Sequence, residues 1–205
     1  MSPAEADMGG AVEGVTGAVL SGGRSARMGG RNKALLPFRG APLIARPLAV
    51  LRGVFAETAI ISNEPAAYAS FGARVIPDVI KDKGPLGGLH AALSACGGRA
   101  VFVAACDMPF LDGALARRLA GDWLAAGGGV SVPKAGGLLE PLCAVYGAEL
   151  AGPLAGFLLK NGDLSVRAFL RTVPVRVMDL GEGAQVRLAF DNLNSPEDFE
   201  RLARR

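Results

Sequence analysis

The chain has 205 residues, of which 50% are hydrophobic and 20% charged, and its net charge is +3. This composition is typical of one globular domain, and the dispersed basic residues indicate neither a nucleic-acid-binding protein nor a membrane protein. Three widely spaced cysteines and a single histidine, His90, exclude a disulfide framework and a multi-histidine metal site. The acidic N-terminus lacks a secretory pattern, so we expect a flexible tail over 1–14, one domain over 15–205, and a cytoplasmic protein.

Short β-rich runs alternate with apolar residues at helical spacing along the chain. Strands are predicted at 14–21, 58–63, 73–78, 100–107, 129–134, 140–147 and 173–180. Helices are predicted at 42–55 with Pro42 in the first turn, 64–72, 111–127, 148–162, 165–172 and 195–205, and the segment 84–96 is predicted to enter a helix from a glycine-rich loop. This alternation predicts an α/β fold, Rossmann-like, with a mostly parallel central sheet and helices on both faces.

In open α/β sheets, ligands bind beyond the carboxyl ends of the strands. The segments 20–33, 62–64, 77–88 and 106–110 follow predicted strands in this way. We therefore expect these segments to converge in space, although they are distant in sequence.

The first of these segments reads L-S-G-G-R-S-A-R-M-G-G-R-N-K. It matches neither the dinucleotide fingerprint nor the Walker loop, which requires a lysine after a glycine. Glycines allow backbone N–H groups to approach a phosphate, and Arg24, Arg27, Arg31 and Lys33 can neutralise it. A solvated basic loop would have the same composition, but its position after the first strand favours a phosphate site.

Asp107 directly follows the most continuous buried run of the sequence. An aspartate at this point either caps the next turn or holds a metal ion, and the cationic loop nearby favours Mg²⁺, which needs only one or two carboxylates. Asn63 and Asp78 also follow strands, but taken alone they are common turn residues.

The pattern L-S-G-G-x-S-x-R-M-G-G-x-x-K-x-L-L resembles the N-terminal motif of nucleoside-triphosphate transferases. GPLGG at 84–88, CDMPFL at 106–111 and FDNLNSPEDF at 190–199 occur in the order found in molybdenum cofactor guanylyltransferases. The resemblance covers about residues 15–205. It implies transfer of GMP from GTP to the terminal phosphate of molybdopterin, in a nucleotidyltransferase fold, with release of pyrophosphate.

The resemblance also implies roles for individual residues. Arg27, Lys33 and Asp107 would be catalytic, with Asp107 as the Mg²⁺ ligand. The nucleotide would contact Leu20, Ser21, Gly22, Gly23, Lys33, Asn63, Asp78, Gly84 and Asp107. Arg167, Asn192 and Asn194 are weaker candidates for binding the acceptor.

The sequence offers few candidate general bases. His90 lies in an apolar helical segment and Cys106 in a buried strand, so neither is expected to act as base or nucleophile. A phosphate monoester acceptor is already anionic and needs only charge neutralisation and alignment. The expected partners are thus GTP and molybdopterin, with transient contacts to other cofactor-biosynthesis proteins or to the recipient enzyme, and no nucleic acid or membrane.

Two other functions stay open. A cytidylyltransferase of the same superfamily would usually carry L-A-A-G in the first loop and a serine-rich loop in place of GPLGG, so Gly22, Gly23 and 84–88 favour guanine. Ser21 departs from the alanine often found in the family. A non-catalytic nucleotide-binding module is the second alternative, against which the joint presence of Lys33 and Asp107 argues.

Overall fold

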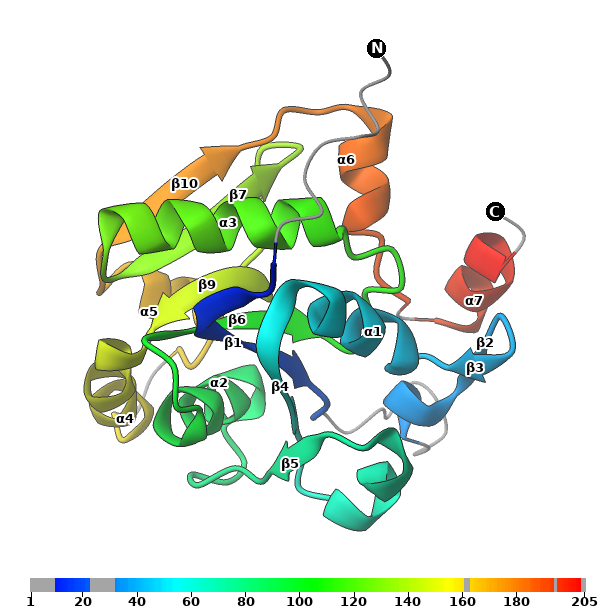
Figure 1. Cartoon of the computed structure of the whole chain (residues 1–205), viewed down its shortest axis with the longest axis horizontal. Helices are drawn as coiled ribbons and strands as arrows, with labels where there is room; N and C mark the ends of the chain where they lie inside the picture. Colours follow the sequence, from blue (N-terminus) through cyan, green and yellow to red (C-terminus); the bar gives the residue numbers. More distant parts are fainter. Residues whose placement is uncertain (1–9, 23–31, 161–162, 194, 204–205) are drawn as a thin grey trace.

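The computed structural model describes residues 10–22, 32–160, 163–193 and 195–203. In these ranges an eight-stranded sheet has the order β10-β7-β9-β6-β1-β4-β5, with β8 paired to β7 (Figure 1). Its strands are β1 (Val12–Leu20), β4 (Phe55–Ile61), β5 (Arg74–Ile76), β6 (Ala100–Ala105), β7 (Val130–Ala135), β8 (Leu138–Leu139), β9 (Cys143–Gly147) and β10 (Val175–Asp179). A separate hairpin pairs β2 (Pro37–Phe38) with β3 (Ala41–Pro42).

The predicted parallel sheet is confirmed for most strand pairs. β1 pairs in parallel with β4 and β6, β4 with β5, and β7 with β10. β9 lies between β6 and β7 and runs antiparallel to both, which the sequence did not predict. All five residues of β9 are buried, and a fully buried run carries no signal of its direction.

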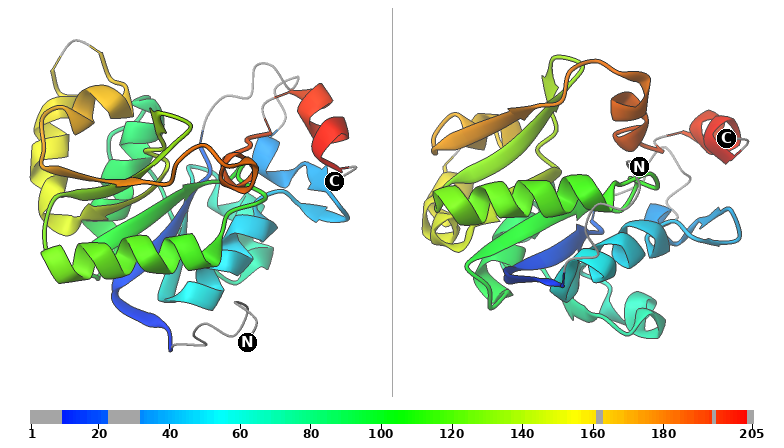
Figure 2. Two further views of the ribbon diagram at one scale, coloured as in Figure 1. Left: turned by 90° about the horizontal axis from the view of Figure 1, so that it is seen from above. Right: turned by 45° about the horizontal axis from the view of Figure 1, so that its top comes forward.

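Helices cover both faces of the sheet, as predicted (Figures 1 and 2). The helices are α1 (Ala45–Val54), α2 (Gly84–Ala95), α3 (Gly113–Ala126), α4 (Ala151–Leu158), α5 (Val166–Leu170), α6 (Ala184–Ala189) and α7 (Pro196–Ala203). The 3₁₀ helices are η2 (Lys33–Leu35), η3 (Pro65–Phe71) and η4 (Ala148–Leu150). Among the described residues, no helix has the length and apolar character that crossing a bilayer requires.

Two apolar clusters, one on each face, explain why β6 reads as a continuous hydrophobic run. Phe102 and Ala104 pack into the cluster beneath α1 and α3, whereas Val101 and Val103 pack into the cluster beneath α2, α4 and α5. Successive side chains of a strand point to opposite faces, so a strand buried on both faces is apolar throughout.

Three local predictions were wrong. Pro42 does not begin a helix: it pairs with Pro37 in the β2–β3 hairpin, and α1 begins at Ala45. The turn of that hairpin uses Arg39 and Gly40, both with positive φ. The 84–88 segment is not a loop, because α2 begins at Gly84. β1 also begins at Val12, so Val12 and Glu13 belong to the sheet rather than to the predicted tail.

The C-terminal helix α7 packs on the β2–β3 hairpin (Figure 1). Phe38 makes edge-to-face contacts with Phe110 and Phe199, with ring centroids 6.2 and 6.1 Å apart. Buried Leu193 joins the same cluster, and its backbone N–H donates to the Asp107 carbonyl oxygen at 3.2 Å. This packing holds the segment before α7 against the turn that follows β6.

Candidate active site

The segments that follow β1, β4, β5 and β6 meet at one edge of the sheet, as predicted. Backbone hydrogen bonds join them in order: Ser21 N–H donates to Ile61, Ser62 N–H to Ile76, and Cys106 N–H to Leu20, at 2.9, 2.9 and 3.1 Å. The strand ends and the segments that follow them, although remote in sequence, are thus fixed side by side, and their polar side chains share one surface.

Lys33 and Asp107 form the centre of this edge. Lys33 Nζ lies 2.5 Å from Asp107 Oδ2, and the two side chains are 16% and 18% exposed. Lys33 opens η2, and Asp107 lies in the turn after β6. Asp112, rather than Asp107, caps the helix that follows, by accepting from Ala114 N–H at 2.8 Å.

Asn63 and Asp78 form a reciprocal pair at the same edge. The Asn63 amide nitrogen donates to Asp78 Oδ2 at 2.9 Å, and the Asp78 N–H donates to Asn63 Oδ1 at 3.0 Å. Asp78 faces the first turns of α2, because a Cβ added at Gly87 or Gly88 would lie 3.6 or 3.8 Å from its carboxylate oxygens. A carboxylate is favoured at the positive end of the helix dipole.

The glycines of 84–88 leave backbone exposed at Gly84 and leave room for neighbouring atoms at Gly87. Gly84 is exposed with φ of 56°, a conformation that favours glycine. A Cβ at Gly87 would meet the Ile80 carbonyl oxygen at 2.9 Å, and one at Gly88 would contact Ile61 and Leu20. Gly87 therefore lets the first turns of α2 lie close to the loop at Ile80, whereas a Cβ at Gly88 would make ordinary van der Waals contact with the ends of β1 and β4.

The residues around Asp107 fit a hard cation. Among the described residues, no three His, Cys, Asp or Glu side chains gather to form a metal cluster. Mg²⁺ needs only one or two protein carboxylates when phosphate oxygens and water complete its shell. Asn192, next to the Leu193 that bonds the Asp107 backbone, has a buried Oδ1 without a hydrogen-bond partner in the described parts of the chain. The Asp107 carboxylate and Asn192 Oδ1 supply the kind of oxygen atom that such an ion, or a polar ligand, requires.

Arg167 lies further along the edge, towards β8 and β9. Its guanidinium donates to the Leu139 carbonyl oxygen at 3.3 Å, and the Leu142 carbonyl accepts from Ala105 N–H at 3.0 Å beside the end of β6. Sequence reasoning missed Glu140 in this segment. Burial raises the pKa of the Glu140 carboxyl group, an effect that Arg167 partly offsets. No hydrogen bond or ion pair described here links Arg167 to Asp107 or Lys33.

His90 lies in α2, as predicted, whereas Cys106 was predicted in a buried strand but lies in the turn after β6 and is partly buried. His90 is 8% exposed in α2, and its Nε2 lies 3.4 Å from Ser94 Oγ of the same helix. Burial and the Asp107 carboxylate raise the pKa of the Cys106 thiol to about 12, although Lys33 opposes the shift. A thiol with this pKa is protonated and poorly nucleophilic at neutral pH.

Leu20, Ser21 and Gly22 lie at the described end of β1. Five predicted residues, Gly23, Arg24, Arg27, Arg31 and Asn194, lie outside the described residues. Sequence reasoning also missed Asn32, Glu64 and Tyr68, which are hydrogen-bonded to one another and to Ser21. They are up to 47 residues apart, and no local pattern marks them.

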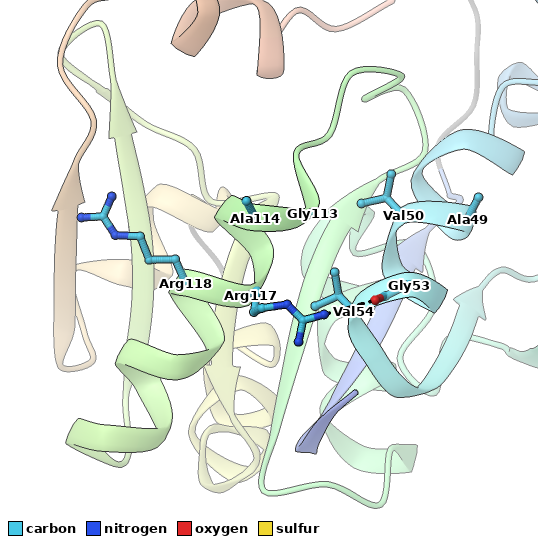
Figure 3. A pocket seen from close by; sticks show the side chains of 8 residues that line it. All are labelled: Ala49, Val50, Gly53, Val54, Gly113, Ala114, Arg117 and Arg118. Carbon is cyan, nitrogen blue, oxygen red and sulfur yellow. Dashed lines mark hydrogen bonds between the residues drawn. The ribbon is translucent and has the colours of Figure 1, made fainter. Parts of the chain in front are cut away.

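A surface hollow of about 640 Å³ lies elsewhere, between α1 and α3 (Figure 3). Its lining is Ala49, Val50, Gly53, Val54, Gly113, Ala114, Arg117 and Arg118. The Arg117 guanidinium is tied to the Gly10 and Gly53 carbonyl oxygens at 2.8 and 3.3 Å. The lining includes no residue predicted to bind nucleotide or acceptor, so this hollow is separate from the edge site.

The MobA-like NTP transferase domain matches residues 17–177 of the chain. The chain belongs to the MobA-like NTP transferases. A probable molybdenum cofactor guanylyltransferase of Pelotomaculum thermopropionicum is 38% identical over 90% of this chain and 89% of its own length. A molybdenum cofactor guanylyltransferase of Cereibacter sphaeroides is 38% identical over 90% and 93% of the two chains. The crystal structure of molybdopterin-guanine dinucleotide biosynthesis protein A from Archaeoglobus fulgidus superposes with a TM-score of 0.77 at 28% identity, covering 92% of this NTP transferase and 97% of that chain.

Proposed function

We propose that this MobA-like NTP transferase transfers GMP from GTP to the terminal phosphate of molybdopterin, with or without bound molybdenum, and releases pyrophosphate. The names of relatives that are 38% identical over 90% of the chain support this assignment. The structural observation that carries it is the contact of Lys33 with Asp107, which joins the basic loop to the acidic turn at the ligand-binding edge.

The reaction requires little proton chemistry from the protein. A bond forms between an oxygen of the acceptor phosphate and the α-phosphorus of GTP, and the bond from that phosphorus to the bridging oxygen of the β-phosphate breaks. Because a phosphate monoester is anionic at neutral pH, no base has to remove a proton. We assign Lys33, together with Arg27 from the same loop, to neutralising charge on the triphosphate and on the departing pyrophosphate.

Mg²⁺ is the metal we propose, held by Asp107. Bound there, the ion would neutralise phosphate oxygens and favour departure of pyrophosphate. The part-exposed carboxylate of Asp107 and the unpaired Oδ1 of Asn192 in the described chain support a site for a hard cation or its ligands at this point. We place Arg167, Asn192 and Asn194 on the acceptor side.

The nucleotide is proposed to lie along the ends of β1, β4 and β5. Leu20 to Gly23 would face the phosphates, while Asn63, Asp78 and Gly84 would face the nucleoside. The hydrogen-bonded pair of Asn63 and Asp78 presents fixed polar groups beside the exposed backbone of Gly84. We further propose that the domain spans 15–205, that the protein acts in the cytoplasm, and that it contacts other cofactor-biosynthesis proteins or the recipient enzyme only transiently.

A thermal-unfolding screen with GTP, CTP, ATP and UTP, each with Mg²⁺, tests the nucleotide assignment. A ligand that binds only the folded protein raises the unfolding temperature according to its affinity. We expect the largest increase with GTP, and we expect Asp78→Ala to remove most of it. Equal or larger stabilisation by CTP would contradict the guanine assignment and favour a cytidylyltransferase.

A further inference from the structure

A hydrogen-bonded group of side chains connects the two described ends of the predicted phosphate-binding loop. Ser21 follows β1 at the start of the loop, and Asn32 directly precedes Lys33 at its end. Tyr68, from η3, is bonded to both: its hydroxyl contacts Ser21 Oγ and accepts from Asn32 Nδ2 at 2.9 Å. Tyr68 is fully buried and Ser21 is 7% exposed, so the bond between them is shielded from water, and the bond from Asn32 is partly shielded.

The chemistry of the partners orients the group. Asn32 Nδ2 also lies 3.0 Å from Glu64 Oε2, and a carboxylate only accepts, so the amino group of Asn32 faces Glu64 and Tyr68. Asn32 Oδ1 accepts from Ala34 N–H at 3.2 Å, which caps η2. The Tyr68 proton is then available to Ser21 Oγ or to Asn32 Oδ1, 3.1 Å away.

We propose that Tyr68 is a positioning residue that holds together the two ends of the phosphate-binding loop and thereby places Lys33 opposite Asp107. The inference rests on the proposed function only in taking this loop to bind a nucleoside triphosphate. Ser21 is fixed to β4 through its backbone bond to Ile61, and Asn32 to η3 through Glu64 and Tyr68. Because Asn32 and Lys33 are consecutive, fixing the first limits where the second can reach.

Such a connection would act on binding through pre-organisation. Side chains that are already held in place lose less conformational entropy when a ligand binds beside them, and Ser21, Asn32 and Lys33 are such residues. Removing the Tyr68 hydroxyl leaves the ring and its packing against Phe71, with centroids 6.0 Å apart, but removes the bonds from Tyr68 to Ser21 and Asn32. Ser21 then keeps its backbone bond to Ile61, and the Asn32 amide keeps only its bond to Glu64 among its bonds to other segments. The expected effect is therefore on affinity for the triphosphate more than on the fold.

Tyr68→Phe tests the proposal, and the chain offers a matched control. Its other tyrosine, Tyr146, is also fully buried, and the hydroxyl donates to the Pro141 carbonyl oxygen at 2.7 Å rather than to the loop. We expect Tyr68→Phe to raise the Kd and KM of the nucleotide about tenfold, with a smaller change in kcat, as loss of a shielded hydrogen bond allows. Tyr146→Phe should lower the unfolding temperature to a similar extent and leave Kd and KM unchanged.

A double variant separates positioning from stability. Tyr68→Phe leaves the buried Ser21 hydroxyl without this partner, and adding Ser21→Ala removes that hydroxyl. The double variant should recover unfolding temperature but keep the weakened nucleotide affinity, because Asn32 still lacks its bond to Tyr68. The single variant Ser21→Ala, measured beside it, gives the part of the loss that comes from the proposed contact of Ser21 with the phosphates. Recovery of affinity together with stability would overturn the proposal, as would equal nucleotide affinities for Tyr68→Phe and Tyr146→Phe.

Calorimetric titrations use GTP and CTP in parallel, because the proposed connection acts on the phosphates and not on the base. Tyr68→Phe should weaken the affinity by about the same factor for each of the two nucleotides that the wild-type protein binds. A wild-type preference for CTP would contradict the proposed guanylyl transfer, while a tenfold loss of that CTP affinity would still support the role of Tyr68. An unchanged affinity in Tyr68→Phe would contradict that role whichever base is preferred.

Discussion

Lys33 Nζ lies 2.5 Å from Asp107 Oδ2 and joins two motifs that are 74 residues apart in the chain. Both side chains are mostly buried, so this pair is less screened by solvent than a surface ion pair. The contact places a fixed cation and a fixed anion at one point of the sheet edge. A triphosphate and its counter-ion need such a pair of opposite charges.

Lys33→Ala should reduce kcat/KM for nucleotidyl transfer by about 30- to 1000-fold, equivalent to roughly 2–4 kcal/mol of transition-state stabilisation. The reason is the loss of the ammonium group that neutralises phosphate charge. Lys160→Ala is the control, because Lys160 is exposed after α4 and is not part of the site. Steady-state kinetics would decide, and a Lys33→Ala enzyme within threefold of wild type would exclude a catalytic role for Lys33.

Asp107→Ala should lower turnover by about 100-fold or more, because the phosphates lose the carboxylate that is proposed to hold Mg²⁺. Asp112→Ala changes the same residue type five positions later and removes only the α3 cap. It should cost about 1 kcal/mol of unfolding free energy and leave turnover unchanged. Titrating Mg²⁺ during turnover compares the two variants, and normal activity of Asp107→Ala at limiting Mg²⁺ would show that another group binds the metal.

The edge site was predicted correctly as a convergence of segments, because strand ends in a parallel sheet necessarily meet at one edge. Lys33 and Asp107 follow from this rule, since each comes directly after the loop or strand that positions it. The reciprocal pair of Asn63 and Asp78 could not be predicted, because either residue alone is an ordinary turn former. Tyr68 has no local signal at all, and its role depends on the folding of η3 against the end of β1.

His90→Gln should keep kcat within about threefold of wild type, because an anionic acceptor phosphate needs no general base. His90 is buried in α2 and its Nε2 faces Ser94 of the same helix. Thermal unfolding of the variant serves as the control, so that a lower activity caused by instability can be recognised. A stable His90→Gln enzyme that has lost most of its kcat would mean that proton transfer limits the reaction.

Gly87→Ala should lower the unfolding free energy and weaken nucleotide binding. An added Cβ would lie 2.9 Å from the Ile80 carbonyl oxygen and 3.6 Å from Asp78 Oδ2, so the loop that carries Asp78 would have to shift. Gly121→Ala is the matched control in α3, since its Cβ would meet nothing within 4 Å. The unfolding free energy of Gly121→Ala should rise by about 1 kcal/mol through improved helix propensity, and the variant should bind nucleotide normally. Denaturant unfolding and calorimetry measure both effects, and a gain of stability in Gly87→Ala would contradict the close packing of α2.

The errors in the fold prediction at Pro42 and at 84–88 share one physical origin. Apolar spacing around Pro42 suggested a helix, but the positive-φ turn at Arg39 and Gly40 forms a hairpin whose Phe38 packs against α7, from the far end of the chain. The glycines of 84–88 suggested a loop, yet α2 begins at Gly84, and Gly87 leaves room for the Ile80 carbonyl oxygen of the preceding loop. In each case a tertiary contact, invisible in the local pattern, decided the conformation.

The central claim is guanylyl transfer to a phosphate acceptor, and one measurement tests it most directly. Purified protein is incubated with Mg²⁺, molybdopterin and either GTP or CTP labelled at the α-phosphate, and the label on molybdopterin and the released pyrophosphate are both quantified. The account predicts label transfer from GTP with one pyrophosphate released per transfer, and much slower transfer from CTP. Transfer from CTP at an equal or higher rate, or no transfer from GTP by a protein that binds it, would contradict the account.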